Sequence, residues 1–289
     1  MSLTLLKAWG MAKARLEAVG LTGPVIDARL LVEAAADATR LDIVTDPHRV
    51  LTAEQEARLE DYLVRRSRRE PVSHILGRKG FWKIMLQVTP DVLTPRPDTE
   101  CVVDAVLKAT GEHDRLSILD LGVGSGAILL AILAERANAR GLGVDVSEEA
   151  LAVARDNAAH LGLAGRCALL RGDWAQGLSD ESFDIVTANP PYIASEVLET
   201  LEPEVRVHEP RLALDGGPDG LAAYRHLAPE ILRVLKPGGR FAVEIGYDQR
   251  TAVEGLFRAA GAMAVTTQQD LAGLDRVVIG EKRALETPA

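Results

Sequence analysis

From residue 115 onward, short apolar runs alternate with helix-like segments, and this alternation constrains the fold more than any other feature. Strand-type runs cover 116–121, 141–146, 167–170, 183–188, 241–245, 264–268 and 276–279. Helices are expected between them, over 127–136, after Ser147, over 221–235 and over 249–260. This order is typical of a doubly wound parallel sheet with helices on its faces. Such sheets bind ligands at the carboxyl ends of their strands.

The chain before this region has a different pattern. Apolar residues recur at helical spacing over 2–70, which predicts three or four helices in a small bundle. Strand-type residues beginning at Phe81 predict a β-hairpin, and Asp98 is expected to cap the helix that follows it. Late in the chain, the charged connection 193–219 is long enough to be a functional lid. The expected divisions are 1–72, 73–97 and 98–289.

Composition restricts the class of protein. The chain has 289 residues and a formal net charge of −9, which suits a phosphate backbone poorly. No apolar run approaches the roughly 20 residues of a membrane helix. Cys101 and Cys167 lie far apart, without the spacing of metal ligands, and a reducing compartment fits them. We expect a cytoplasmic protein with no membrane span, no metal and no stable nucleic-acid partner.

The sequence Asn189-Pro190-Pro191-Tyr192 follows the apolar run 183–188. Each proline fixes its own φ, lacks an N–H group and restricts the residue before it to extended conformations. The loop is therefore stiff. The Asn189 side-chain oxygen and a main-chain carbonyl could together accept two hydrogen bonds from one planar NH₂ group, with Tyr192 covering its face. A plain turn after a strand could have the same residues, so the motif remains a hypothesis.

Three further features follow the earlier strands. The turn Gly122-Val123-Gly124-Ser125-Gly126 brings backbone close to a ligand at a helix N-terminus, although its spacing differs from the dinucleotide-binding motif. Asp145 ends the second strand, where a carboxylate can accept both hydroxyls of a ribose. Asp173 and Trp174 end the third strand and could bind and stack on an adenine. Each feature alone is weak, but together they predict a nucleoside ligand.

These features, with several further motifs, resemble the HemK/PrmC family, whose members methylate the glutamine amide in the Gly-Gly-Gln motif of peptide chain release factors. The resemblance runs from the N-terminal helices to the C-terminal strands. One departure is Val123, where the family usually has threonine. The segments that carry the resemblance are 71–77, 81–82, 94–100, 120–128, 189–193, 209–214 and 219–221.

The resemblance implies a class I S-adenosylmethionine-dependent methyltransferase, with a Rossmann-like doubly wound sheet that includes a C-terminal antiparallel strand. It implies an N-terminal helical substrate-recognition domain over 1–72, a linking β-hairpin over 73–97 and a methyltransferase catalytic domain over 98–289. Release factors would be the protein substrates, and the enzyme would act as a monomer in translation termination.

The resemblance also assigns roles to residues. Gly122, Val123, Gly124, Ser125 and Gly126 would wrap the methionine part of S-adenosylmethionine. Asp145 would hold the ribose, and Asp173 and Trp174 would lie near the adenine. Asn189 and the carbonyl of Pro190 would grip the substrate amide, with Pro191 and Tyr192 against it, and Asn189 would also border the cofactor. Asn189, Pro190 and Tyr192 are thus the expected catalytic residues.

Other readings remain open at this point. DNA and RNA methyltransferases that act on amino groups carry similar loops, because their substrates also present a planar NH₂ group. Such enzymes need a basic surface, and this chain offers only the arginines of 65–69 and the pair Arg78-Lys79. A non-catalytic adaptor that binds the cofactor is a second alternative. An NAD-linked oxidoreductase is a third, against which the glycine spacing argues.

Overall fold

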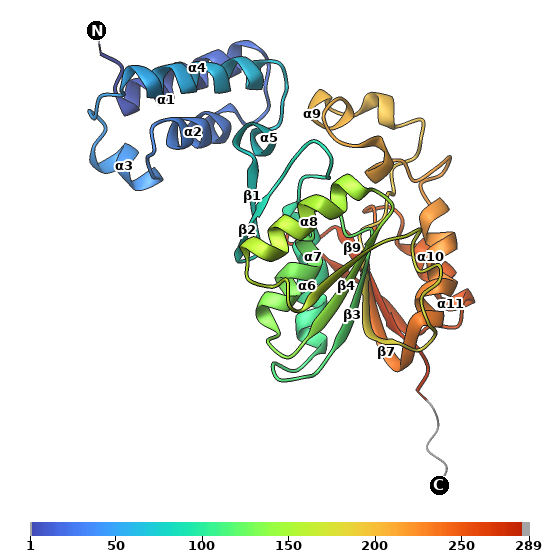
Figure 1. Cartoon of the computed structure of the whole chain (residues 1–289). Coiled ribbons are helices and arrows are strands. Elements are labelled where there is room, and N and C mark those ends of the chain that lie inside the picture. The colour runs from blue at the N-terminus through green and yellow to red at the C-terminus, as the bar shows by residue number, and fades with distance from the viewer. Residues whose placement is uncertain (1, 285–289) are drawn as a thin grey trace. The chain divides into compact units, whose positions relative to one another are not determined.

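The computed structural model describes residues 2–284, which form two compact units (Figure 1). The smaller unit contains the chain up to Arg78 together with Glu202–His208. The larger unit contains Lys79–Leu201 and the chain from Glu209 onward. The domain boundaries predicted from sequence placed 202–208 in the catalytic domain, whereas the contacts of this segment group it with the helical unit.

The smaller unit is helical. Its apolar core includes Leu5, Leu31 and Leu63, each fully buried. A capping box begins the helix that follows Thr52: Thr52 Oγ1 accepts from Gln55 N at 3.2 Å, and Gln55 Oε1 accepts from Thr52 N at 3.1 Å. The helices of this unit are α1 (Leu5–Ala18), α2 (Pro24–Ala35), α3 (Arg40–Thr45), α4 (Ala53–Ser67), α5 (Val72–Leu76) and α9 (Pro203–Arg206).

A sheet of seven strands forms the centre of the larger unit, in the order β5-β4-β3-β6-β7-β9-β8. Strands β3 to β7 are mutually parallel, and β9 lies antiparallel between β7 and β8. The predicted doubly wound sheet with a C-terminal antiparallel strand is therefore confirmed. The strands are β3 (Ser117–Leu121), β4 (Arg140–Asp145), β5 (Cys167–Arg171), β6 (Phe183–Ala188), β7 (Leu235–Glu244), β8 (Met263–Gln269) and β9 (Asp275–Glu281).

Helices cover both faces of this sheet (Figure 1). Consecutive strand residues point to opposite faces, so Ile118 packs in one apolar cluster and Leu119 in the other. The first cluster is formed with α6 (Glu100–Ala109), α7 (Ala127–Glu135) and α8 (Glu148–His160). The second is formed with α10 (Ala222–Val234) and α11 (Arg250–Ala259). The strand ends between these layers are thereby held rigidly.

Several local predictions differ from the structure. The hairpin region begins with α5, and its two strands are β1 (Arg78–Phe81) and β2 (Ile84–Gln87). Asp98 caps no helix: it lies inside the short 3₁₀ helix η1 (Pro97–Thr99), and its carboxylate lies 3.4 Å from Arg276. The proline at the start of η1 favours this tight turn before α6 begins. The connection 193–219 contains η2 (Leu198–Thr200), α9 and η3 (Arg211–Ala213).

Candidate active site

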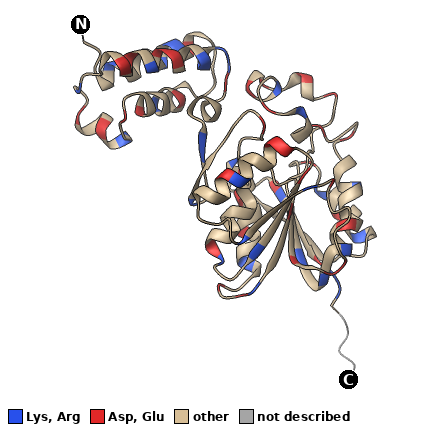
Figure 2. Cartoon of the chain, in the orientation of Figure 1, with Lys and Arg blue, Asp and Glu red and all other residues tan. Residues whose placement is uncertain are grey.

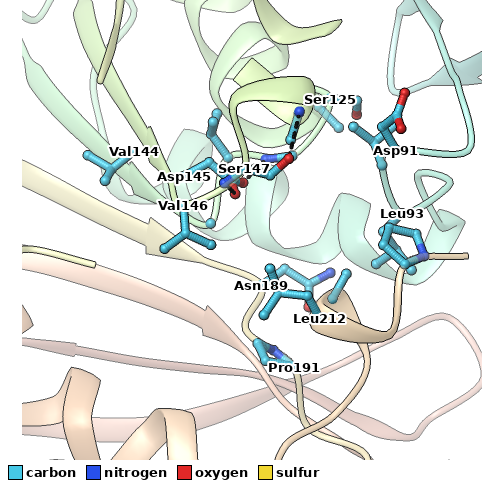
Figure 3. Close-up of a pocket in the computed structure, with 18 of the residues that line it drawn as sticks. Asp91, Leu93, Ser125, Val144, Asp145, Val146, Ser147, Asn189, Pro191 and Leu212 are labelled. Atoms are coloured by element: carbon cyan, nitrogen blue, oxygen red, sulfur yellow. Dashed lines mark hydrogen bonds between the residues drawn. The ribbon is translucent and has the colours of Figure 1, made fainter. Parts of the chain in front are cut away.

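A pocket opens at the carboxyl edge of the sheet in the larger unit, with a volume of about 320 Å³. Figure 3 shows Asp145 and Ser147 on one side of it and Asn189, Pro191 and Leu212 on the other. The expected site residues that line the pocket are Gly122, Val123, Gly124, Ser125, Asp145, Asp173, Trp174, Asn189 and Pro191. The expected residues that do not line it are Gly126, Pro190 and Tyr192.

The glycine turn needs backbone conformations that L-residues rarely adopt. Gly122 and Gly124 have φ values of +73° and +52°. The turn is fixed to the next strand, because the N–H groups of Gly122 and Val123 both donate to the Val144 carbonyl, at 2.9 and 3.0 Å. Gly126 has a different role: a Cβ there would lie 2.8 Å from Leu130, so this glycine permits packing within α7.

Asp145 ends β4 and supports the glycine turn. Its Oδ2 accepts from Gly124 N at 2.9 Å, and its Oδ1 accepts from Ser147 N at 3.0 Å. Each carboxylate oxygen has further lone pairs, so Asp145 can still accept hydrogen bonds from a ligand in the pocket. One carboxylate therefore both shapes the turn and presents acceptors beside it.

Trp174 and Asp173 follow β5. Trp174 has a φ of +52° and is half-buried, and its ring lies over the first glycine, where a Cβ on Gly122 would be 3.5 Å from Cζ3. Asp173 is exposed and accepts from Gln176 Nε2 at 2.9 Å. The indole thus forms an apolar wall next to the glycine turn, and the carboxylate lies at the rim.

The Asn189 side chain is held on one side only. Its Nδ2 donates to Thr99 Oγ1 at 3.2 Å, while its Oδ1 is buried and has no hydrogen-bond partner among residues 2–284. Within the same described range, no backbone hydrogen bond reaches the Pro190 carbonyl. A buried acceptor that lacks a partner costs free energy until a donor binds it. This geometry suits a donor-rich group such as an NH₂.

The rest of the loop is tightly packed. Gln249 Nε2 donates to the Tyr192 carbonyl at 2.9 Å. A Cβ on Gly216 would lie 2.8 Å from Tyr192 Cα, and one on Gly220 would lie 2.4 Å from the Tyr192 carbonyl oxygen. The two glycines of the connection therefore allow it to press against the loop, which adds to the stiffness that the prolines impose.

Tyr192 does not form a wall of the pocket. Its ring packs beside the second apolar cluster, and its hydroxyl donates to Glu244 Oε1 at 3.5 Å. Burial, with the Glu244 charge as a second cause, raises the pKa of Tyr192 above its usual 10. The phenol therefore stays neutral at physiological pH.

The sequence did not single out two residues of this site, Thr99 and Glu244. Thr99 lines the pocket and is 4% exposed, and Glu244, at the end of β7, is 1% exposed. Burial raises the pKa of Glu244 to about 7, although the nearby Thr99 hydroxyl and the Arg276 charge act in the opposite direction. Thr99 could have been found from its place in the motif 94–100. The only feature of the sequence that points to Glu244 is its position near the end of a predicted strand.

Arg96 and Phe81 differ in their relation to the pocket. Arg96 lines the pocket, and its Nη2 lies 2.6 Å from Oε2 of the buried Glu209. Phe81 is 1% exposed and packs in the first apolar cluster, so it supports the site only indirectly.

The arginine cluster at the end of α4 is used within the smaller unit. Arg66 lies 2.7 Å from Asp27 and 3.0 Å from Glu204, and Arg69 lies 3.0 Å from the same Glu204 oxygen. Arg65 Nε donates to Glu70 at 2.9 Å. Figure 2 shows acidic and basic residues interspersed along the helices of this unit. These arginines therefore do not form an open basic surface.

The described part of the chain shows neither a metal-binding cluster nor a membrane-spanning helix. Within residues 2–284, no group of three or more histidine, cysteine or acidic residues could hold a metal ion. Every helix of that same range is too short or too polar to cross a membrane. Cys101 and Cys167 are both free thiols.

Comparison with solved structures supports the fold. A methyltransferase from Pyrococcus furiosus superposes with a TM-score of 0.52 at 19% identity, covering 68% of this chain and 88% of that one. A ribosomal protein L11 methylase from Lactobacillus delbrueckii subsp. bulgaricus gives a TM-score of 0.50 at 19% identity, with 68% and 85% coverage. At this identity the likeness shows a shared fold and nothing further.

Comparison with known families is more specific. One family model, the PrmC N-terminal domain, matches residues 7–77, and another, a methyltransferase domain, matches 112–273. A release factor glutamine methyltransferase from Caulobacter vibrioides is 70% identical over 289 residues, all of both chains. One of the same name from Agrobacterium fabrum is 43% identical over 271 residues, 92% of this chain and 93% of that one. The chain therefore belongs to the release factor glutamine methyltransferase family.

Proposed function

We propose that this protein transfers a methyl group from S-adenosylmethionine to the side-chain amide nitrogen of the glutamine in the Gly-Gly-Gln motif of peptide chain release factors. The observation that carries the proposal is the buried Asn189 Oδ1, which lacks a partner among the described residues and borders the pocket. Two relatives that match this chain over 100% and 93% of their length, and whose names state release factor glutamine methylation, support the same substrate.

The residues of the pocket fit the proposed cofactor. The backbone of the turn Gly122–Gly126 would hold its methionine part, since Gly124 leaves open space where a Cβ would stand. Asp145 would accept from the ribose hydroxyls with its remaining lone pairs. Trp174 would stack near the adenine and Asp173 would accept from its amino group at the rim. Bound S-adenosylmethionine supplies a methyl group that the positive charge on its sulfur activates.

The chain's own residues would prepare the nucleophile. An amide nitrogen is a poor nucleophile, because its lone pair is delocalised into the carbonyl. Acceptance of its two N–H bonds by Asn189 Oδ1 and the Pro190 carbonyl would raise electron density on nitrogen and fix its direction. The same oxygens would stabilise positive charge that develops there. A methylated amide cation is strongly acidic, so it would lose its extra proton to water, and the site would need no dedicated general base.

We further propose that the enzyme acts as a monomer in the cytoplasm, on a protein rather than on nucleic acid. The net charge of −9 and the pairing of Arg65, Arg66 and Arg69 with acidic residues leave little attraction for a phosphate backbone. The helical domain over 1–72, together with 202–208, would recognise the release factor.

Incubation with a purified release factor and isotope-labelled S-adenosylmethionine, followed by mass mapping, tests the proposal. We expect one added methyl group on the glutamine of the Gly-Gly-Gln motif. A release factor with glutamate at that position is the matched control and should gain none. Label on duplex DNA or on RNA, with none on the release factor, would show that the substrate assignment is wrong.

A further inference from the structure

Leu212 lines the pocket and yet stays largely exposed. Among the described residues, two exposed large apolar side chains line the pocket, Leu212 at 64% and Val146 at 40%. Figure 3 shows Val146 on the side of Asp145, and Leu212 on the side of Asn189. The apolar surface of Leu212 therefore belongs to the part of the pocket that holds the unpartnered acceptor Asn189 Oδ1.

The backbone around Leu212 is fixed to the loop that contains Asn189. The N–H group of Ile193 donates to the Leu214 carbonyl at 3.0 Å, and that of Gly216 donates to the Ile193 carbonyl at 2.8 Å. Leu214 is only 7% exposed and anchors the segment. Because Leu212 is held in place before any ligand binds, a ligand that covers it loses little free energy in ordering the protein.

A single exposed leucine on a protein surface needs no explanation by itself. The chemistry beside Leu212 is what indicates an occupant. Asn189 Oδ1 is a buried acceptor without a partner among residues 2–284, so a donor is expected there. A group that supplies both a donor for Asn189 and apolar surface for Leu212 carries an NH₂ at the end of a short hydrocarbon stem. A glutamine side chain has this chemistry, with two methylene groups between its Cα and its amide.

We propose that Leu212 is a substrate-binding residue, against which the methylene groups of the substrate glutamine pack while Asn189 Oδ1 accepts from its amide. This inference rests on the proposed function, since it concerns the same glutamine. Burial of methylene groups against a leucine is favourable. It also removes water that competes for the acceptor, and a hydrogen bond in such a dry environment is stronger.

Replacement of Leu212 by alanine removes most of this apolar wall. We expect kcat/KM for a purified release factor to fall by about fivefold to thirtyfold. The loss should appear mainly as a higher KM, because the contact is present both before and during methyl transfer. Titration calorimetry should show that affinity for S-adenosylmethionine stays within about twofold, and urea unfolding should be unchanged, because the side chain is mostly exposed.

Two further variants separate apolar surface from shape. Leu212→Met keeps an apolar side chain of similar volume and should retain at least about a third of wild-type kcat/KM. Leu212→Asn has a similar branched shape but is polar, so it should lose as much as Leu212→Ala. Leu271→Ala is the matched control, because Leu271 is a fully exposed leucine of the same unit outside the pocket lining. It should leave kcat/KM unchanged.

A double-mutant cycle with the release factor identifies what Leu212 contacts. Binding is measured by calorimetry in the presence of S-adenosylhomocysteine, which carries no methyl group to transfer. Leu212→Ala should weaken binding of the normal release factor by at least about threefold. It should weaken binding of a release factor with glycine in place of the glutamine by less than about 1.5-fold, because the partner side chain is already absent.

The outcomes separate this inference from the proposed function. Equal weakening of both release factors would place the contact elsewhere on that protein, and a loss of cofactor affinity would place it on the cofactor. Either result, a wild-type kcat/KM for Leu212→Ala, or an equal loss for Leu271→Ala would overturn the inference while methylation itself stands. If wild-type protein methylates no release factor, the proposed function is wrong and the inference falls with it.

Discussion

Arg96 Nη2 lies 2.6 Å from Glu209 Oε2, although 113 positions separate the two residues. The Glu209 side chain is 1% exposed, while that of Arg96 is 40% exposed and lines the pocket. The pair therefore links the wall of the pocket to the C-terminal half of the connection 193–219. A buried carboxylate that loses such a partner is costly.

Arg96→Leu should consequently lower the free energy of unfolding by about 1–3 kcal/mol, the cost of an unpaired buried acceptor. Arg225→Leu is the control, since Arg225 pairs with Asp219 on the surface and both side chains are about half exposed. That change should cost at most about 1 kcal/mol. Urea unfolding measures both. Equal losses of stability in the two variants would show that the Arg96–Glu209 pair stabilises the fold no more than a surface ion pair does.

Asn189→Ala should reduce the single-turnover rate of methylation by about a hundredfold to a thousandfold, because one of two acceptors on the substrate nitrogen is removed. Cofactor affinity should be largely retained. Asn138→Ala, at an exposed position in the same unit, should have the wild-type rate. Rapid-quench kinetics with labelled cofactor give the rate, and calorimetry gives the affinity. A normal rate for Asn189→Ala would refute its assignment.

Asp145→Ala should weaken binding of S-adenosylmethionine by about tenfold to a hundredfold. The change removes acceptors for the ribose and also releases the N–H groups of Gly124 and Ser147. Titration calorimetry measures this directly. Asp156→Ala, on the exposed face of α8, should bind the cofactor normally. Unchanged affinity in Asp145→Ala would place the ribose elsewhere.

Stability should depend on pH through Asp120. Burial raises the pKa of Asp120 from its usual 3.8 to about 7, although Thr187 donates to it at 2.8 Å. Between these values the folded state binds a proton that the unfolded state does not. The free energy of unfolding therefore falls as pH rises through this window, by at most about 1.4 kcal/mol per pH unit from this group.

Asp120→Asn removes the titration and keeps an acceptor for Thr187. Its stability relative to wild type should rise between pH 5 and 7, as measured by urea unfolding at each pH. Asp219→Asn is the control, because hydrogen bonds from Arg225 and from the Leu221 backbone lower the pKa of Asp219 to about 2, outside the window. If the difference in free energy of unfolding between Asp120→Asn and wild type does not change between pH 5 and 7, Asp120 is ionised throughout that range.

Glu204→Gln should destabilise the smaller unit by about 1–2 kcal/mol, because Arg66 and Arg69 both lose a charged acceptor. Arg66 would keep Asp27, which limits the loss. Glu196→Gln, at an exposed position of the connection 193–219, should change stability by less than about 0.5 kcal/mol. Thermal unfolding compares the two. Identical midpoints would contradict a stabilising role for Glu204.

The sequence was informative where periodicity and local chemistry agree. The strands of the sheet and the turn after β3 could be predicted, because apolar runs of strand length ended in glycine or in a polar residue. The loop beginning at Asn189 was found because two prolines restrict it locally. Each of these signals is contained within a few neighbouring residues.

What could not be predicted depends on residues that only folding brings together. Thr99 and Asn189 are 90 positions apart, and Glu244 comes from a third segment, so no spacing in the sequence links them. The expectation that Asp98 caps a helix was wrong because its carboxylate has a distant partner, Arg276. The ion pairs of Glu204 with Arg66 and Arg69 also join residues that are remote in sequence.

The segment 202–208 belongs to the helical unit, yet its flanking residues belong to the larger one. The backbone therefore passes between the two units at 78/79, at 201/202 and at 208/209. A fragment that begins at Lys79 would keep Glu204 but lose Arg66 and Arg69. Glu204 would then lack both arginines with which it forms ion pairs. Truncation at a single position therefore cannot remove the whole helical unit, because the segment 202–208 would remain in the fragment.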